Sequence, residues 1–420
     1  MGLTDTGAGP AIIFGAWSWG SRAYPVVIAQ PKKAQPRFAS DWRITALDRN
    51  FHLEWNDEGH DYFDVLNANG CPAASYFARP LNRTAIWPQN DLVVMYSQAK
   101  SPSPAGPDDW SSVPLPQGAD WVGYGPVYCS LVAGRPVLSA FGGLRSGNRV
   151  DPTIKVAWAI TAAPESPTDW NFFDFPSVED FDSALTFVDL LGRPAAAFMG
   201  DPALGFGGYP KGYMAVLANG AAPATPWAIT PVCYGSSGKP LLAVSEDSIY
   251  LLYAKADALL LARAAIAECQ NPAGWETSTV VSGALCDPVW LGLIGGEPAV
   301  FYQIEHASEQ RHAGLYYARP AHGKWQDEDD WLRVRLRKHW LWYYAAAIGG
   351  RPAFAAFTYS PEPHIFYTWA DSEQPISRND WHTCTVFARE MKPKKPAGAG
   401  SDQGTAGAVS CVTVMAAPTV

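Results

Sequence analysis

A tryptophan recurs at the end of each of seven similar stretches of this chain. The spacing between successive tryptophans runs from 48 residues (Trp227 to Trp275) to 68 residues (Trp42 to Trp110). Most of them directly follow an aspartate. The seven are Trp42, Trp110, Trp170, Trp227, Trp275, Trp331 and Trp381. Self-similarity at a period of this size is typical of repeat architectures, in which each unit is one supersecondary element that packs on its neighbours.

A glycine–proline turn precedes a short run of small apolar residues in most units. Clear examples begin at Gly134, Gly192, Gly296 and Gly350, and looser ones at Gly70 and Gly9. In the fifth unit, Gly238-Lys239-Pro240 comes too soon, 11 residues after Trp227, against 19 residues from Trp331 to Gly350. The spacing therefore predicts that the turn of this unit lies at Glu246-Asp247-Ser248, with strands at 241–245 and 249–254.

Each unit contains four short apolar or alternating segments bounded by Gly, Pro and Asp. In the fourth unit they are 185–191, 194–199, 213–218 and 227–231. Such segments are typical of strands and turns. Four strands repeated seven times predict an all-β chain that folds as a seven-bladed β-propeller with four-stranded blades, an arrangement that protects the sheet edges.

The ends of the chain suggest how the ring closes. The first unit begins at Gly9-Pro10, already at its turn, so it is expected to lack its innermost strand. Residues 391–408 have the composition of a linker, and the strand-like run Val409–Met415 follows. We therefore expect residues 1–390 to form the propeller, 391–408 to form the linker, and 409–420 to carry a closing strand that completes the first blade.

The repeat unit G-x-P-A-x-A-F, then L-x-Y-A, then D-W, resembles repeats of seven-bladed propellers in the broad sialidase-like and lectin-like group. The resemblance covers nearly the whole chain and implies fold rather than activity. The Asp-box S-x-D-x-G-x-x-W, typical of sialidases, is absent from the sequence, as are the WD40 and kelch signatures. No catalytic residue is therefore carried over from the resemblance.

Composition narrows the range of partners. The net charge of −9 argues against nucleic acid, which requires stripes of Lys and Arg. No apolar run is long enough for a membrane helix, so no membrane partner is expected. The seven cysteines show no paired spacing, and the N-terminus lacks a signal-peptide pattern. We expect a monomer that is cytoplasmic, or released without a signal peptide.

The repeat separates structural residues from candidate functional ones. The seven tryptophans recur in every unit, so we expect them to pack between blades, with the preceding Asp closing a turn. The connections that leave each outer strand, and those between second and third strands, do not repeat. They are rich in aromatic, basic and acidic residues, and all of them should lie on one face of the ring.

Counting back ten residues from each turn glycine places His60, Tyr124, Asp182, Cys286 and Trp340 at the starts of inner strands. We expect these positions to surround the mouth of the central channel. His and carboxylate groups there could act as acids and bases. The catalytic candidates are His60, Asp61, Asp182, Asp287 and His339. The substrate-binding candidates are Trp17, Trp19, Arg22, Tyr124, Arg337, Trp340 and Trp342.

Several functions remain open. The favoured hypothesis is a single ligand site in the central funnel, in an enzyme of lyase or hydrolase type that acts on a glycan or a small polar metabolite. The alternatives are a carbohydrate-binding lectin and a protein-interaction platform. No cofactor is evident, although His and Asp in the funnel could hold a divalent cation. Arg337-Lys338-His339 could attract an anionic substrate, and a solvated basic patch would explain it equally well.

Overall fold

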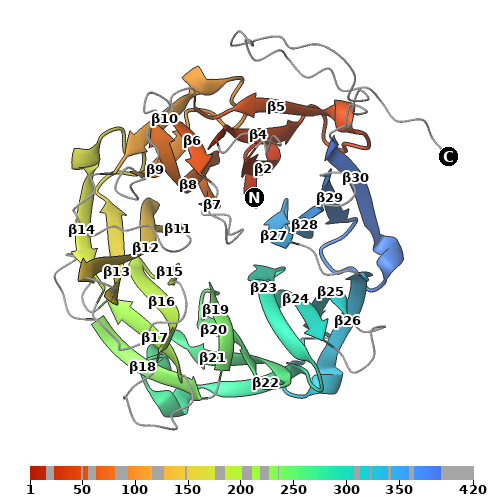
Figure 1. The fold of residues 1–420 in the computed structure, drawn as a ribbon. Coiled ribbons are helices and arrows are strands. Elements are labelled where there is room, and N and C mark those ends of the chain that lie inside the picture. Colours follow the sequence, from red (N-terminus) through yellow and green to blue (C-terminus); the bar gives the residue numbers. More distant parts are fainter. Residues whose placement is uncertain are drawn as a thin grey trace, which may run out of the picture.

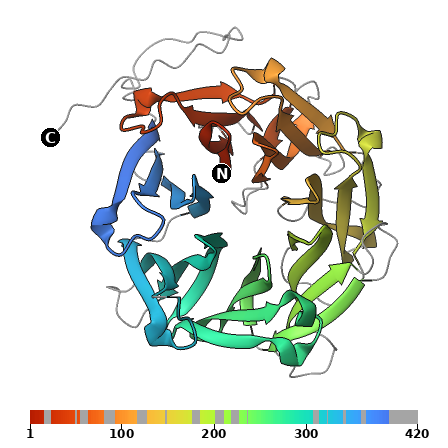
Figure 2. The same ribbon diagram turned by 180° about the vertical axis from the view of Figure 1, so that it is seen from behind.

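The computed structural model confirms an all-β seven-bladed propeller with four-stranded antiparallel blades. Figure 1 shows the seven sheets around a central axis, with the seventh blade next to the first, and Figure 2 shows the same ring from behind. The structure describes residues 1–15, 23–48, 51–54, 63–80, 93–115, 127–146, 149–175, 185–200, 211–217, 227–234, 236–306, 313–321, 323–338, 342–358 and 364–388.

The strands of each blade follow one another from the channel outward. Blade 1 contains β1 (Gly2–Thr6), β2 (Gly9–Gly15), β4 (Val26–Pro31) and β5 (Trp42–Ala46). Blade 2 contains β7 (Phe63–Ala68), β8 (Cys71–Pro80), β9 (Val93–Ala99) and β10 (Trp110–Pro114). Blade 3 contains β11 (Val127–Val132), β12 (Arg135–Ser146), β13 (Arg149–Ala159) and β14 (Trp170–Asp174).

The remaining blades repeat this order without interruption. Blade 4 contains β15 (Thr186–Leu190), β16 (Arg193–Gly200), β17 (Lys211–Leu217) and β18 (Trp227–Tyr234). Blade 5 contains β19 (Ser236–Val244), β20 (Ser248–Lys255), β21 (Ala258–Ala265) and β22 (Glu276–Val281). Blade 6 contains β23 (Leu285–Ile294), β24 (Glu297–His306), β25 (Gly314–Pro320) and β26 (Trp331–Arg337). Blade 7 contains β27 (Trp342–Ile348), β28 (Arg351–Thr358), β29 (His364–Ala370) and β30 (Trp381–Ala388).

Tight turns join the first and second strands, as the glycine–proline pattern predicts. In blade 3, Ala133 and Gly134 both have positive φ, 49° and 69°. Two consecutive positive φ values are the geometry of a two-residue hairpin turn that matches strand twist. The fifth turn lies between β19 and β20, where the Ser245 Oγ accepts the N–H of Ser248 at 3.0 Å. The spacing argument against Gly238-Lys239-Pro240 is therefore confirmed.

The aspartate before the tryptophan closes a turn, also as predicted. In blade 7, one carboxylate oxygen of Asp380 accepts the backbone N–H groups of Ile376 and Ser377, both at 2.8 Å. A single 3-10 turn, η9 (Arg378–Asp380), separates this cap from Trp381. The same arrangement surrounds η1 (Ala39–Asp41), η3 (Pro107–Asp109), η4 (Pro167–Asp169) and η8 (Glu328–Asp330).

The tryptophans pack between blades, which confirms their structural role. Trp170, in blade 3, lies edge-on to Tyr96 of blade 2 with centroids 5.2 Å apart. Trp381, in blade 7, contacts Phe301 and Tyr317 of blade 6 at 5.9 and 5.4 Å. Each of these rings reaches back to the preceding blade. Burial of large aromatic rings is the main apolar contribution to such interfaces.

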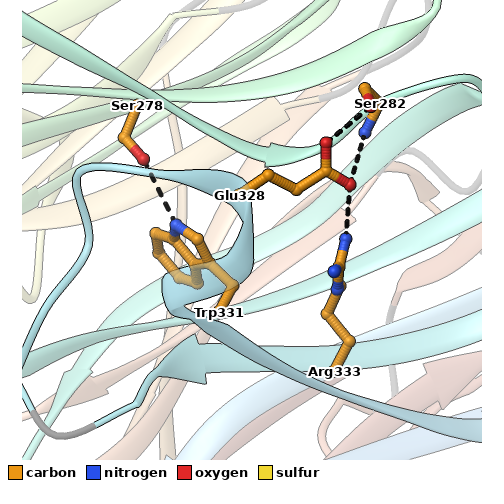
Figure 3. Close-up of polar contacts among 5 residues, drawn as sticks. All are labelled: Ser278, Ser282, Glu328, Trp331 and Arg333. Carbon is orange, nitrogen blue, oxygen red and sulfur yellow. Dashed lines mark hydrogen bonds and ion pairs between the residues drawn. The ribbon is translucent and has the colours of Figure 1, made fainter.

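Polar contacts supplement the apolar packing between blades 5 and 6. Figure 3 shows the Trp331 indole N–H donating to the Ser278 Oγ at 3.3 Å. Beside it, the Glu328 carboxylate accepts the Ser282 hydroxyl at 2.5 Å and the Arg333 guanidinium at 2.6 Å. Burial alone would raise the pKa of Glu328, but these hydrogen bonds outweigh it and the pKa is lowered. The hydrogen bonds of Ser278 and Ser282 thus join the two blades at their outer edge, and the ion pair between Glu328 and Arg333 lies within blade 6.

The expectation that the first unit lacks its innermost strand is wrong. Residues Gly2–Thr6 form that strand, β1, and it pairs with β2 over Gly2↔Ile13 to Thr6↔Gly9. A Cβ at Gly2 would lie 2.4 Å from a methyl carbon of Val65, so only glycine fits here against blade 2. The expected closing strand at 409–415 lies outside the described residues, and the position it was assigned in blade 1 is occupied by β1.

The ring closes through contacts of the kind that join the other blades. Trp42 of blade 1 packs on Tyr367 of blade 7, and the Asp5 carboxylate accepts the N–H of Gly349, in the blade 7 turn, at 2.8 Å. Phe14 and Phe387 add a third contact at 5.9 Å. Within the described residues, closure thus uses noncovalent side-chain contacts, and the four strands of the blade 1 sheet all come from residues 2–46. Among the described residues, no helix is long and apolar enough to span a membrane.

Candidate functional site

The two faces of the ring differ in how their polar residues are used. One face, here called the turn face, carries the hairpins between first and second strands. There Asp189 accepts the N–H groups of Gly192, in its own turn, and of Ala133, in the turn of blade 3. Asp5 does the same for Gly349. These carboxylates hold turns of adjacent blades together, which is a structural role.

The opposite face, here called the connection face, carries the links from each blade to the next. Between blades 1 and 2 this link adds backbone pairing beyond the regular blades. Strand β6 (Phe51–Glu54) pairs with the end of β8, and β3 (Ala23–Tyr24) pairs with β6. The sheet of blade 2 is thereby extended to six strands. This pairing joins a segment between β2 and β4 of blade 1 to blade 2.

Most of the site residues predicted from the sequence lie outside the described residues. This applies to the catalytic candidates His60, Asp61, Asp182 and His339, and to the binding candidates Trp17, Trp19, Arg22, Tyr124 and Trp340. In four blades the position that the ten-residue offset assigns to the inner-strand start also lies outside the described residues. The described parts of their inner strands begin at Phe63, Val127, Thr186 and Trp342. In blade 6 the offset holds, since Cys286 is the second residue of β23.

Asp287 lies near the connection-face end of β23, the inner strand of blade 6. It is partly buried and pairs in register with Gln303 of β24. Its neighbour Cys286 is buried in the core toward blade 5, so strand alternation directs Asp287 to the side of blade 7. Burial, aided by the charge of Asp287, raises the pKa of the Cys286 thiol to about 12. That thiol is therefore not a nucleophile at neutral pH.

Trp342 is the first residue of β27, the inner strand of blade 7. The next residue, Tyr343, is buried in the core toward blade 6, and alternation directs Trp342 toward blade 1. Its side chain is 37% exposed, in contrast with the interface tryptophans, of which Trp42 is 4% exposed. An exposed indole at the end of an inner strand is a suitable surface for stacking against a ligand ring.

Arg337 ends β26, the outer strand of blade 6, and its guanidinium extends toward blade 7. The guanidinium carbon lies 5.6 Å from the centre of the Phe366 ring, and an Nη donates to the Thr383 Oγ1 at 3.3 Å. Phe366 and Thr383 belong to the two outer strands of blade 7. The three described candidates thus lie at blades 6 and 7, with Asp287 and Trp342 on inner strands and Arg337 in the outer half of the interface.

Two further polar residues lie on inner strands and were not singled out from the sequence. The Asp64 carboxylate, on β7, accepts the N–H of Cys129 in β11 at 3.1 Å. Burial, with a contribution from Asp64, raises the pKa of the neighbouring Tyr128. The hydrogen bond joins the inner strands of blades 2 and 3. The sequence feature that could have identified Asp64 is an acidic residue within an apolar strand, Phe63-Asp64-Val65.

Metal binding finds no support in the described parts of the chain. Within those ranges, no three side chains among His, Cys, Asp and Glu are grouped closely enough to hold a metal ion. Several proposed funnel residues fall outside the ranges, so this finding concerns Asp287 and the structural carboxylates. At blades 6 and 7, the three described candidates supply a carboxylate, an exposed indole and a guanidinium.

Comparison with known proteins finds similarity in fold only. No protein-family model matches the sequence, and no curated protein matches it. Among solved structures, polysaccharide lyase Uly1 is similar over 85% of this chain and 86% of its own, with a TM-score of 0.52 and 9% sequence identity. An α-L-arabinofuranosidase from Lactobacillus brevis matches over 57% of this chain and 82% of its own, at a TM-score of 0.35 and 11% identity.

The NanB sialidase from Streptococcus pneumoniae matches over 91% of this chain and 66% of its own, at a TM-score of 0.32 and 12% identity. The protein is therefore a seven-bladed propeller whose fold is similar to that of a polysaccharide lyase, at 9% sequence identity. Such likeness at these identities establishes the fold and leaves the activity to be argued from the site.

Proposed function

We propose that this propeller binds a glycan at the channel mouth on the connection face and cleaves it by elimination, as a polysaccharide lyase. The observation that carries the proposal is the match to a polysaccharide lyase over 85% of this chain. Proteins that share a fold often catalyse different reactions. The proposal therefore also needs residues of the right kind at the mouth of the channel.

The distribution of polar residues supports a single asymmetric site. The recurring aspartates are occupied as turn caps or as links between turns, as Asp380 and Asp189 are. The recurring tryptophans are buried or half-buried between blades. Asp287 and the exposed Trp342 do not recur, and they lie on neighbouring inner strands. A lectin with one equivalent site in each blade would instead repeat its binding residues along with the scaffold.

The chemistry of elimination requires few groups. A base removes the proton next to the carboxylate of a uronic acid, a carbon–carbon double bond forms, and the glycosidic oxygen departs with a proton. His60 and His339 are the proposed bases, since imidazole titrates near neutral pH. Asp61, Asp182 and Asp287 would hold the sugar hydroxyls and orient the histidines. The segments that carry His60 and Asp61, Asp182 and His339 precede β7, β15 and β27 directly in the chain.

The aromatic side chains would hold the sugar rings. Trp342 is proposed to stack on one sugar, and Trp17, Trp19, Trp340 and Tyr124 to form the remaining walls of the site. Arg22 and Arg337 are proposed to bind charged groups of the ligand. Burial of sugar faces on indole rings would supply affinity, while hydrogen bonds from the carboxylates fix orientation.

A screen against acidic and neutral polysaccharides tests this proposal. Ultraviolet absorbance of a conjugated unsaturated uronate indicates elimination, and new reducing ends without that absorbance indicate hydrolysis. We expect elimination on at least one uronate-containing polymer. Hydrolysis would be consistent with the proposed site but would show that the reaction is not elimination. Binding without any cleavage would identify a lectin and contradict the proposal of a lyase.

A further inference from the structure

Three arginines occupy alternate positions on β26, and the structure provides different partners for each. Arg333 forms an ion pair with Glu328 at 2.6 Å. Arg335 donates to the backbone carbonyl oxygen of Ala313 at 2.5 Å. Arg337 donates to the Thr383 hydroxyl at 3.3 Å, and within the described ranges no carboxylate lies within ion-pair distance of it. Arg333, which has an acidic partner, is therefore a suitable control for Arg337, which has none among the described residues.

An irregularity in strand pairing directs Arg337 toward blade 7. Tyr316 pairs with Arg335, but the next residue back, Leu315, pairs with Arg337, so Leu336 is an extra residue in the outer strand. A bulge of this kind reverses the alternation of side chains beyond it. Arg337 therefore shares the face of Leu315, which is buried in the core between blades 6 and 7.

The surroundings of the guanidinium suit an anion. The guanidinium carbon lies over the Phe366 ring, and the phenol of Tyr343 is near enough to influence the guanidinium electrostatically. Burial lowers the pKa of Arg337, and the neighbouring charge of Arg378 acts in the same direction. The described groups around Arg337 therefore include a second cation, hydroxyls and an aromatic ring. A partly buried cation in such surroundings is stabilised by an added negative charge.

The shape of the guanidinium narrows the class of anion. Its fork of N–H donors matches the paired oxygens of a carboxylate or the oxygens of a sulfate ester, with two parallel hydrogen bonds. Asp287 lies on the same side of blade 6, at the other end of the row Asp287, Gln303, Leu315, Arg337. Three strand spacings separate the two ends, about 14 Å. A ligand that contacts both would be an oligosaccharide rather than one sugar.

We propose that Arg337 forms an anion-binding subsite at the outer half of the interface between blades 6 and 7, which takes a carboxylate or sulfate group of an acidic glycan whose chain extends toward the channel mouth. The subsite rests on the proposed function for the glycan. It differs from the catalytic centre in position and in role, since it would bind and orient the chain without contacting the bond that breaks.

Affinity electrophoresis of the whole protein tests the subsite. Native gels would contain polygalacturonate as the carboxylate probe, dextran sulfate as the sulfate probe, or dextran as the neutral control. We expect the protein to be retarded by at least one acidic polymer and not by dextran. R337Q should weaken the apparent affinity about tenfold or more. R337K should recover part of the loss, since charge remains while the fork is lost. R333Q should bind as the unmodified protein does.

The outcomes separate the subsite from the lyase. Retention of full affinity by R337Q, or no retardation of the unmodified protein by either acidic polymer, would overturn the subsite. Thermal melts of each variant identify any loss of folding, and R337K keeps the test valid if R337Q is unstable. Retardation that depends on Arg337 without any unsaturated product would support the subsite and count against the lyase. If the protein catalyses elimination and R337Q has the same KM as the unmodified protein, the result would support the lyase and count against the subsite.

Discussion

Trp42 and Tyr367 pack edge-on across the junction of the first and seventh blades, with ring centroids 5.5 Å apart and ring planes at 75°. The two residues are 325 positions apart in the chain (367 − 42), and their contact closes the ring. The same geometry recurs at Tyr96 and Trp170, where centroids are 5.2 Å apart and planes meet at 69°. The closing interface is therefore built like an internal one.

Replacing Trp42 should destabilise the ring as much as replacing an internal tryptophan does. Trp42 is 4% exposed, so Trp42→Ala leaves a cavity between blades 1 and 7. The expected loss is about 3–5 kcal/mol in the free energy of unfolding, measured by urea denaturation. Trp170→Ala is the matched control at an internal interface. A much smaller loss for Trp42→Ala would mean that another contact holds the ring closed.

Removal of residues 389–420 should leave stability nearly unchanged. The four described strands of each blade lie within residues 2–388, so truncation removes none of them. We expect a change within about 0.5 kcal/mol in the free energy of unfolding. The control is Leu3→Asp in β1, where a 6%-exposed side chain becomes a buried charge. If the truncated protein loses its cooperative transition, the last residues take part in closure after all.

Leu191 should be a site where substitution stabilises the protein. It occupies the first position of the blade 4 turn with φ 54°, and its side chain is 68% exposed. The left-handed conformation costs a branched side chain roughly 1–2 kcal/mol, while glycine loses more chain entropy on folding. Leu191→Gly should therefore gain about 0.5–1 kcal/mol, measured by chemical denaturation. Gly192→Ala, at φ 80°, should do the reverse, and equal effects of the two changes would refute the strain argument.

Acid should destabilise the protein through its turn-capping aspartates. A hydrogen bond from Lys33, then backbone N–H groups of Arg37 and Phe38, lower the pKa of Asp41 from 3.8 to about 2. Backbone hydrogen bonds also lower the pKa values of Asp169 and Asp380. A carboxyl with a lowered folded pKa stabilises the protein above its unfolded pKa, and that contribution is lost as the pH falls through the folded value.

Stability should thus be level above about pH 5 and fall between about pH 4 and pH 2. Asp41→Asn should reduce the slope of stability against pH in that window, as measured by thermal melts across the pH series. Asp329→Asn is the control, because Asp329 is exposed in the turn of blade 6 and accepts no hydrogen bond from the described residues. An identical slope for Asp41→Asn and the unmodified protein would show that the cap does not couple to folding.

The repeat made much of the fold predictable. The spacing of tryptophans fixed the blade count, and the distance from Trp227 located the fifth turn correctly. The first inner strand was missed because Gly2–Thr6 contains a single large apolar residue, Leu3, and pairs only after the chain folds back at Gly7. A strand of five residues with one apolar side chain carries little periodic signal.

The site was less predictable than the fold. The row of paired residues from Asp287 to Arg337 depends on a bulge at Leu336. One extra residue in a strand reverses the side to which every later side chain points. No pattern in the sequence marks that bulge. The residues that do not recur could be recognised as candidates, because the recurring ones are needed between blades. Their arrangement depends on loops whose conformation the repeat does not determine.

A single site at the channel mouth, to which Asp287 of blade 6 and Trp342 of blade 7 contribute, is tested most directly by the elimination rates of two site variants and one control. Asp287→Asn should lower kcat/KM by about a hundredfold or more, and Trp342→Ala by about tenfold through KM. Asp189→Asn, the same change on an inner strand at the turn face, should leave the rate unchanged. If Asp287→Asn and Trp342→Ala both retain the rate of the unmodified protein, the site lies elsewhere and the account is wrong.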